Sequence, residues 1–139
     1  MSNIVRFSMS LNRRLLEPFD KVIVKKGYPS RSEAIRDLIR KYLVSEEWKK
    51  DKKETAGTIT LVYDHETREL GEKLTHLQHK HLNLIISTTH IHLDKHNCLE
   101  VIIVRGKGDR IKTLADKLIS LKGVKHGKLT MATTGRELK

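Results

Sequence analysis

The first residues of this chain alternate apolar and polar side chains, but no second strand follows to pair with them. In residues 3–12, NIVRFSMSLN, apolar side chains occupy every second position from Val5 to Leu11. A period of two predicts a half-buried β-strand. The residues that follow, up to about residue 48, carry helical patterns only. An isolated strand leaves backbone N–H and C=O groups unpaired, so we expect this strand to pair with its own copy across a two-fold axis.

Two amphipathic helices are expected after this strand. The first should begin near Asn12, which can cap it, and end at Gly27, although Pro18 is unfavourable inside a helix. The second should begin at Ser30, because Ser30 and Glu33 match a capping box. Two copies of this unit would form a two-stranded ribbon over a base of helices. Apolar residues of the strand should face that base, and the apolar stripes of the helices should face its interior. These residues are Val5, Phe7, Met9 and Leu11 of the strand, Leu15, Leu16, Phe19, Val22 and Ile23 of the first helix, and Ala34, Ile35, Leu38, Ile39, Tyr42 and Leu43 of the second.

The polar face of the strand indicates a partner. Arg6, Ser8 and Ser10 would point away from the helices, and a two-stranded ribbon fits the major groove of DNA, where such side chains can reach base edges. The chain has a formal net charge of +11 and a sequence pI of about 9.9, a surplus that favours an anionic partner. We therefore expect double-stranded DNA as the partner of this part of the chain.

From Gly57 onward the sequence alternates between strand and helix patterns. The expected elements are a strand over residues 58–64, a helix over 65–82, strands over 84–93 and 98–106, a helix over 109–123 and a strand over 125–133. The order β-α-β-β-α-β is that of ferredoxin-like (ACT-like) domains. We therefore predict an α+β chain with an N-terminal domain over residues 1–50, a linker over 51–56 and a C-terminal domain over 57–139.

Histidines and the single cysteine of the chain gather around the predicted hairpin of the C-terminal domain. His90 and His92 are two residues apart, so they should point to one face of their strand, and Cys98 opens the neighbouring strand opposite them. His79, on the preceding helix, could supply a fourth donor. Three nitrogens and one sulfur suit Ni(II), Cu(II) or Zn(II), and the donor types alone do not choose among these metals.

Several segments resemble one family of regulators. The pattern of a strand, a helix, a Gly-containing turn and then SRSEAIRDLIRKYL, residues 30–43, resembles ribbon-helix-helix DNA-binding proteins. RSEAIRDLIR within it is especially similar to the nickel-responsive repressors of that group (the NikR family). HKHLNLIISTTHIHLDKHNCLEV, residues 79–101, is similar to their nickel-site segment, and LKGVKHGKLTM, residues 121–131, is typical of them. The similarity extends over essentially the whole chain.

The resemblance implies a nickel-responsive repressor of nickel uptake that binds palindromic operator DNA as a homotetramer, a dimer of dimers. In this family a histidine–X–histidine pair, a cysteine and a helix histidine of the neighbouring protomer bind Ni(II) in a planar site. The corresponding residues here are His90, His92, Cys98 and His79. The C-terminal domain would then be the metal-binding and tetramerisation domain. Glu100, on the same strand face as Cys98, would be placed to hydrogen-bond a ligand.

The resemblance also implies contacts made by the N-terminal domain. The start of the second helix holds a backbone phosphate in this family, in agreement with the attraction of anions to exposed N–H groups. The expected base contacts are Arg6, Ser8 and Ser10, and the expected phosphate contacts are Ser30, Arg31 and Ser32. The family also places a second cation near Glu33 and Asp37, although a capping residue and a solvated acid explain this pair equally well.

Three other functions stay open. A copper or zinc sensor would use the same architecture and the same donors. A ribbon-helix-helix antitoxin would use its C-terminal segment to bind a partner protein, which the regular β-α-β-β-α-β pattern disfavours. An enzyme with a catalytic zinc would need a general base, and we find none at a convincing spacing, nor a nucleophile elbow or phosphate loop. We therefore expect no enzyme activity.

The sequence also indicates a compartment. No apolar run is long enough to span a bilayer, no signal peptide opens the chain, and a single cysteine fits a reducing environment. We therefore expect a cytoplasmic protein with no membrane partner. The five histidines outside the predicted metal site are expected to be structural or surface residues: His65, His76, His81, His96 and His126.

Overall fold

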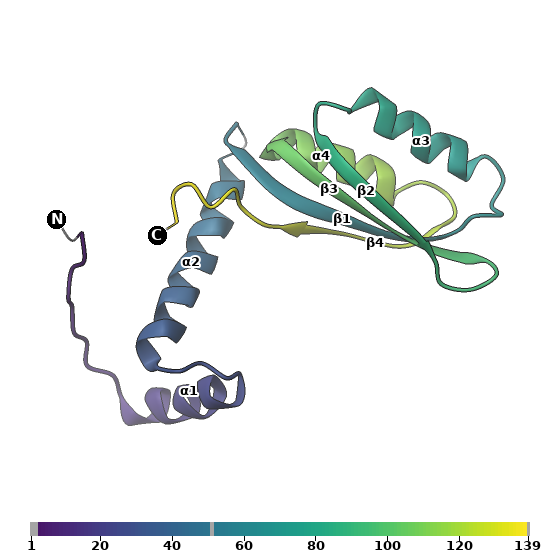
Figure 1. Ribbon diagram of the computed structural model, residues 1–139. Coiled ribbons are helices and arrows are strands. Elements are labelled where there is room, and N and C mark those ends of the chain that lie inside the picture. The colour runs from purple at the N-terminus through teal and green to yellow at the C-terminus, as the bar shows by residue number, and fades with distance from the viewer. Residues whose placement is uncertain (1–2, 51, 139) are drawn as a thin grey trace. The chain divides into compact units, whose positions relative to one another are not determined.

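The computed structural model describes residues 3–50 and 52–138 (Figure 1). The chain forms two compact units, Met1–Lys41 and Tyr42–Lys139, which divide within helix α2 (Arg31–Lys49). The predicted linker over 51–56 begins at a residue outside the described ones, and its end already belongs to strand β1 (Glu54–Asp64). The predicted limits of the domains remain a prediction for the assembled protein.

The two N-terminal helices form as the capping residues predict. Helix α1 (Arg13–Lys25) follows Asn12, whose Oδ1 accepts a hydrogen bond from the N–H of Arg14 at 2.9 Å. Pro18 lies inside α1 without ending it. At the start of α2 the Ser30 hydroxyl accepts from the Glu33 N–H at 3.1 Å, which is one half of the predicted capping box. The Glu33 carboxylate does not complete the box, because two arginines of α2 bind it instead.

Residues 3–12 are extended but are not part of a sheet within the described chain, where all strand pairings lie in the C-terminal unit. Their apolar side chains are open to solvent, with Val5 85% and Phe7 66% exposed. Of the described residues up to Lys41, only Ile23 and Ala34 are buried. A strand needs a hydrogen-bonded neighbour, and a single copy of this unit supplies none.

The C-terminal unit has the predicted β-α-β-β-α-β order. After β1 its elements are α3 (Leu70–Lys80), β2 (Ile85–His92), β3 (Asn97–Lys107), α4 (Gly108–Ile119) and β4 (Val124–Met131). The strands form one antiparallel sheet in the order β2-β3-β1-β4, which confirms the α+β, ferredoxin-like prediction (Figure 1). Helix α3 begins later than predicted, and the residue before it, Glu69, has a left-handed φ of 65°.

The hydrophobic core lies between the sheet and the two helices α3 and α4. Alternate residues of β1 and β3 face the helices and are fully buried, among them Ile59 and Ile102. Trp48, near the end of α2, joins this core and donates its Nε1–H to the Ala132 carbonyl at 2.8 Å. The opposite face of the sheet is less covered, and Ile103 there is 39% exposed. Among the described residues, no helix has the length and apolar character needed to cross a membrane.

Candidate functional site

The hairpin of β2 and β3 brings the predicted metal ligands of both strands together. In this pairing His92 lies opposite Cys98, and His90 lies opposite Glu100. Cys98 and Glu100 belong to the face of β3 that the helices cover, and both are buried. The period-two pattern predicts that residues two apart on one strand share a face, and the structure adds the register across the hairpin.

The carboxylate of Asp94 holds the turn between these strands. Its Oδ1 accepts hydrogen bonds from the backbone N–H groups of His96 at 2.9 Å and of Asn97 at 2.8 Å. These hydrogen bonds lower the pKa of Asp94 to about 2, and the bonds from Asn97 contribute most to this shift. The ionised Asp94 carboxylate stabilises the turn fully above the ordinary aspartate pKa, and this stabilisation is lost as the pH falls through about 2. The turn that sets the spacing of His92 and Cys98 is therefore intact at neutral pH.

Cys98 is the centre of a three-donor cluster. Its Sγ lies 3.3 Å from Nδ1 of His92 and 3.4 Å from Nδ1 of His65, and one donor atom of each of the three residues lies within 4.8 Å of the others. Burial raises the pKa of the Cys98 thiol, and the carboxylates of Asp64 and Glu100 add to the effect. At neutral pH the thiol is therefore protonated, and a bound cation must displace that proton.

His65 is the member of this cluster that the sequence analysis missed. It was expected to be a structural or surface residue, and it lies in the loop between β1 and α3. The pairing of β1 with β3 places Tyr63 opposite Cys98, so the residues after Tyr63 lie beside the start of β3. The N–H of His65 donates to the His96 carbonyl at 3.1 Å. In the ferredoxin-like strand order the first and third strands lie side by side. This order could have predicted that His65 lies near Cys98.

Glu100 connects the cluster to two other elements. Its carboxylate accepts hydrogen bonds from the Tyr63 hydroxyl of β1 at 3.1 Å and from Nε2 of Gln78 of α3 at 2.7 Å. Burial and this carboxylate raise the pKa of Tyr63, which therefore stays a hydrogen-bond donor at neutral pH. Nδ1 of His90 lies 3.9 Å from Glu100 Oε1, and the ring centroids of His90 and His92 are 5.3 Å apart. Glu100 thus lies next to His90 but beyond hydrogen-bond distance, and its role in orienting a ligand stays a prediction.

Two of the predicted ligands, His90 and His79, do not belong to this cluster. His79 is exposed on α3, in the residue after Gln78. No group of metal-binding donors among the described residues of this chain includes it. Its role as a ligand therefore requires a second protomer, as the sequence analysis expects.

The predicted DNA contacts all lie on the N-terminal unit and are exposed. They are Arg6, Ser8 and Ser10 of the extended segment and Ser30, Arg31 and Ser32 at the start of α2. The guanidinium of Arg31 donates Nε–H to one Asp20 oxygen at 2.8 Å and Nη2–H to the other at 2.6 Å. Asp20 is thus the partner that orients Arg31, and the same contact lowers the pKa of Asp20.

The predicted second cation pair, Glu33 and Asp37, already has cationic partners within the chain. Glu33 is bound by Arg36 at 3.0 Å and by Arg40 at 3.3 Å, contacts that lower the pKa of Glu33. Asp37 accepts a hydrogen bond from the hydroxyl of Tyr28, and Lys41 approaches it to 3.2 Å. A cation at this pair would have to replace those basic side chains.

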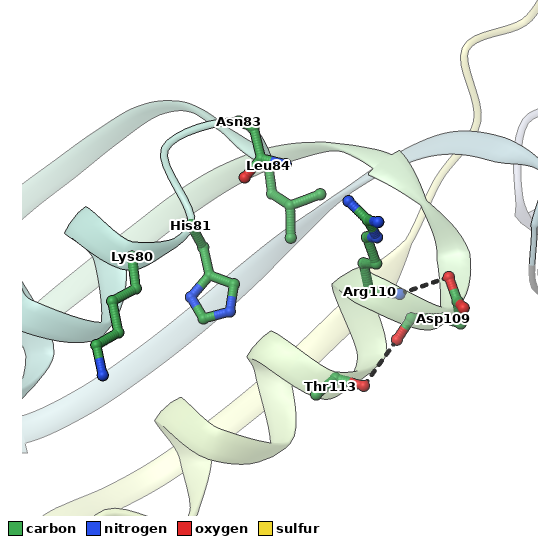
Figure 2. Close-up of a pocket in the computed structure, with 7 residues that line it drawn as sticks. All are labelled: Lys80, His81, Asn83, Leu84, Asp109, Arg110 and Thr113. Carbon is green, nitrogen blue, oxygen red and sulfur yellow. Dashed lines mark hydrogen bonds between the residues drawn. The ribbon is translucent and has the colours of Figure 1, made fainter.

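A cavity of about 350 Å³ lies apart from the predicted ligands, between the end of α3 and the start of α4 (Figure 2). Its lining residues are Lys80, His81, Asn83, Leu84, Asp109, Arg110 and Thr113. Cationic side chains and Asp109 both line it, and Asp109 Oδ1 accepts from the Arg110 N–H at 2.8 Å. None of the predicted site residues reaches it.

The donor set at Cys98 fits a first-row divalent transition metal. A thiolate is a soft ligand and imidazole a borderline one, a combination that selects Ni(II), Cu(II) or Zn(II) over Mg(II) or Ca(II). The thiol is buried while His92 and His65 are exposed, so a metal can reach the donors from solvent. Hydrogen-bonded neighbours already restrain the hairpin and Glu100, as metal sites require.

Comparison with known proteins gives matches over both units. Residues 56–132 match the family described as the NikR C-terminal nickel binding domain. Residues 5–46 match the family described as ribbon-helix-helix protein, copG family. Together the two matches cover the extended segment, α1, most of α2 and the sheet that holds Cys98.

Relatives align over nearly the full length of the chain. One from Geobacter metallireducens is 57% identical over 138 residues, which cover 99% of both chains. One from Thermococcus kodakarensis is 57% identical over 135 residues, which cover 97% of this chain and 98% of the relative. Both carry names that describe nickel-responsive regulators. Among solved structures, an uncharacterized protein from Thermotoga maritima shares the fold at a TM-score of 0.51 and 16% identity, over 56% of this chain and 96% of that one.

Proposed function

This chain belongs to the family of nickel-responsive regulators with a ribbon-helix-helix domain, and on that premise we propose that it represses nickel uptake by binding palindromic operator DNA when it carries Ni(II). The family consists of DNA-binding regulators and is not an enzyme family. The observation that carries the proposal is the contact of 3.3 Å between Cys98 Sγ and His92 Nδ1, within a domain that matches a nickel-binding family.

The proposed ligands are His90, His92 and Cys98 of one protomer and His79 of a second protomer. When bound, Ni(II) supplies strong bonds between side chains of two chains. Glu100 keeps its position through Tyr63 and Gln78, and Gln78 is adjacent to His79 on α3. Helix α3 therefore contacts Glu100 through Gln78 and would present His79 to the metal. Metal binding and the ordering of α3 would then be linked.

The proposed DNA-binding element is a ribbon made by residues 3–12 of two chains. Its support is the exposure of Phe7 and its apolar neighbours, since a monomeric protein rarely exposes a continuous apolar patch of this kind. Pairing would cover those side chains and leave Arg6, Ser8 and Ser10 on the outer face, where they read base edges. Ser30, Arg31 and Ser32 would hold a backbone phosphate at the start of α2, with Arg31 oriented by Asp20.

The proposed assembly is a homotetramer, a dimer of dimers, in the cytoplasm. The face of the sheet away from the helices carries partly exposed apolar residues, Ile103 among them, and such a face favours contact with another copy. Metal binding then favours arrangements of two ribbons that fit both halves of an operator. This works only if the DNA-competent state binds the metal more tightly than the other states do. A cation at Glu33 and Asp37 belongs to the same proposal.

A titration of the purified full-length protein tests this function. Addition of Ni(II) should produce a visible absorption from a planar Ni(II)–thiolate site, and the protein should then retain an operator fragment in a mobility assay. A zinc sensor of the same architecture is the alternative that His65 favours, because His65, His92 and Cys98 already form a three-donor group within one chain. Zn(II) that supports operator retention while Ni(II) does not would replace the nickel proposal with that one.

Nickel affinity should increase with pH near neutrality. The pKa of the buried Cys98 thiol is raised, so the apo protein holds a proton that leaves when the thiolate becomes a ligand. Between about pH 7 and about pH 8, the release of one proton from the thiol makes the apparent affinity rise about tenfold. Competition with a chelator of known pH dependence measures this slope. An affinity independent of pH over that range would argue against the thiol as a ligand.

A further inference from the structure

A second group of donor atoms lies on the loop that carries His65. Asp64, Glu66 and His96 each present one atom, two carboxylate oxygens and one imidazole nitrogen, and these atoms all lie within 4.8 Å of one another. The group shares no residue with the cluster of His65, His92 and Cys98. It combines the loop between β1 and α3 with the turn between β2 and β3, and neither the predicted ligands nor the family matches assign it a role.

Backbone hydrogen bonds hold these two loops together. Asp64 is the last residue of β1 and pairs with Asn97 at the start of β3. The N–H of His65 donates to the His96 carbonyl at 3.1 Å, and the N–H of Glu66 donates to Asp64 Oδ1 at 2.9 Å. The first of these bonds joins main-chain atoms of the two loops, and the second fixes the Asp64 side chain beside Glu66, so the three donors stay close without the help of a cation. A site whose donors are already positioned loses less entropy when a cation binds.

The charges of this group match a divalent cation. Two carboxylates and a neutral imidazole carry a charge of about −2, in a chain whose net charge is +11. The neighbouring cation of β4, Lys125, donates to Asn97 Oδ1 at 2.6 Å and so has a partner outside the three donors. His96 Nδ1 also lies 3.1 Å from Glu66 Oε2, which is the contact that a cation would replace.

We propose that Asp64, Glu66 and His96 form a second site for a divalent cation, separate from the Cys98 centre. Two oxygens and one nitrogen suit a borderline or hard ion such as Zn(II), Co(II) or Mn(II), with water completing the coordination. The site is exposed, so it exchanges its ion readily and binds more weakly than the thiolate centre. It is independent of the proposed function, because its three donors belong to one chain and include none of the nickel ligands.

Zinc binding by full-length variants tests this site. The Cys98→Ala variant serves as the background, because it removes the thiolate centre from the measurement. Equilibrium dialysis against Zn(II) with metal quantification should show one fewer zinc per chain after His96→Ala is added, and a loss of affinity of about tenfold or more after Glu66→Gln. The matched controls are His126→Ala, an exposed histidine of β4, and Glu72→Gln, an exposed acid of α3.

The two outcomes are distinct. Loss of one zinc with His96→Ala and none with His126→Ala supports the site. Equal zinc binding by all variants overturns it and leaves the contact between His96 and Glu66 as a simple hydrogen bond. Circular dichroism confirms that each variant is folded. Because every variant lacks the thiol, neither result depends on whether nickel controls operator binding.

Discussion

Cys98→Ala is expected to abolish tight nickel binding and, with it, the nickel-dependent retention of operator DNA. Cys98 is the only thiol of the chain, so the variant keeps imidazoles alone as strong donors. Nickel affinity should fall by more than about a hundredfold, because loss of a direct ligand exceeds the effect of losing a ligand's hydrogen-bond partner. The visible absorption of the Ni(II)–thiolate site should also disappear. Metal titration and a mobility assay on the same preparation measure both effects.

The variant must remain folded for this result to be informative. Cys98 is fully buried, but removing one sulfur atom from the core leaves a small cavity that costs about 1 kcal/mol. Size-exclusion chromatography should therefore show an unchanged oligomer. His126→Ala, which removes an exposed histidine of β4, is the matched control and should bind nickel normally. If Cys98→Ala still retained the operator in a nickel-dependent way, the assignment of the metal centre would be wrong.

Arg6→Ala is expected to remove operator preference more than general affinity for DNA. A bidentate contact between arginine and guanine is worth about 1–3 kcal/mol of discrimination between bases. A ribbon made of two chains would lose this contact twice in each half-site. Competition between an operator fragment and a scrambled fragment, at one salt concentration, measures the preference directly.

The control variant loses the same charge but leaves the predicted base contact of Arg6 intact. Lys21 is an exposed cation of α1, so Lys21→Ala removes the same positive charge from the same unit. It should weaken binding to the operator and the scrambled fragment by the same small factor. Equal losses on both fragments for Arg6→Ala would show that Arg6 contacts phosphates or nothing, and the ribbon would not read bases through it.

The sequence predicted the C-terminal fold because its central strands and its last helix each have a clear period. β1 and β3 alternate between buried and partly exposed residues, and α4 buries one face, so period alone identified them. The N-terminal strand was predicted by the same rule, but one copy of the chain cannot form it. The hydrogen-bond partner expected for this strand lies in another molecule. Only the argument from unpaired backbone groups predicts that second chain.

The candidate site was predicted in part. His92 lies opposite Cys98 across the hairpin, as the local sequence allowed, whereas His90 lies opposite Glu100 and outside the three-donor cluster. His65 escaped notice because the helical pattern was extended to it, whereas α3 begins only at Leu70. Contacts between segments distant in the sequence, such as Arg31 with Asp20, depend on packing and leave no periodic signal. The ligand assignments themselves stay predictions until metal binding is measured.

The scarcity of buried side chains in the N-terminal unit has a consequence for how the regulator accumulates in a cell. With only Ile23 and Ala34 buried among its described residues, this unit would gain most of its stability from the proposed association with another chain. In the proposed assembly the ribbon forms only when two chains meet, so by mass action its amount rises with the copy number of the protein. Ni(II) that joins side chains of two chains would favour the same association, so the supply of metal and the copy number would act together.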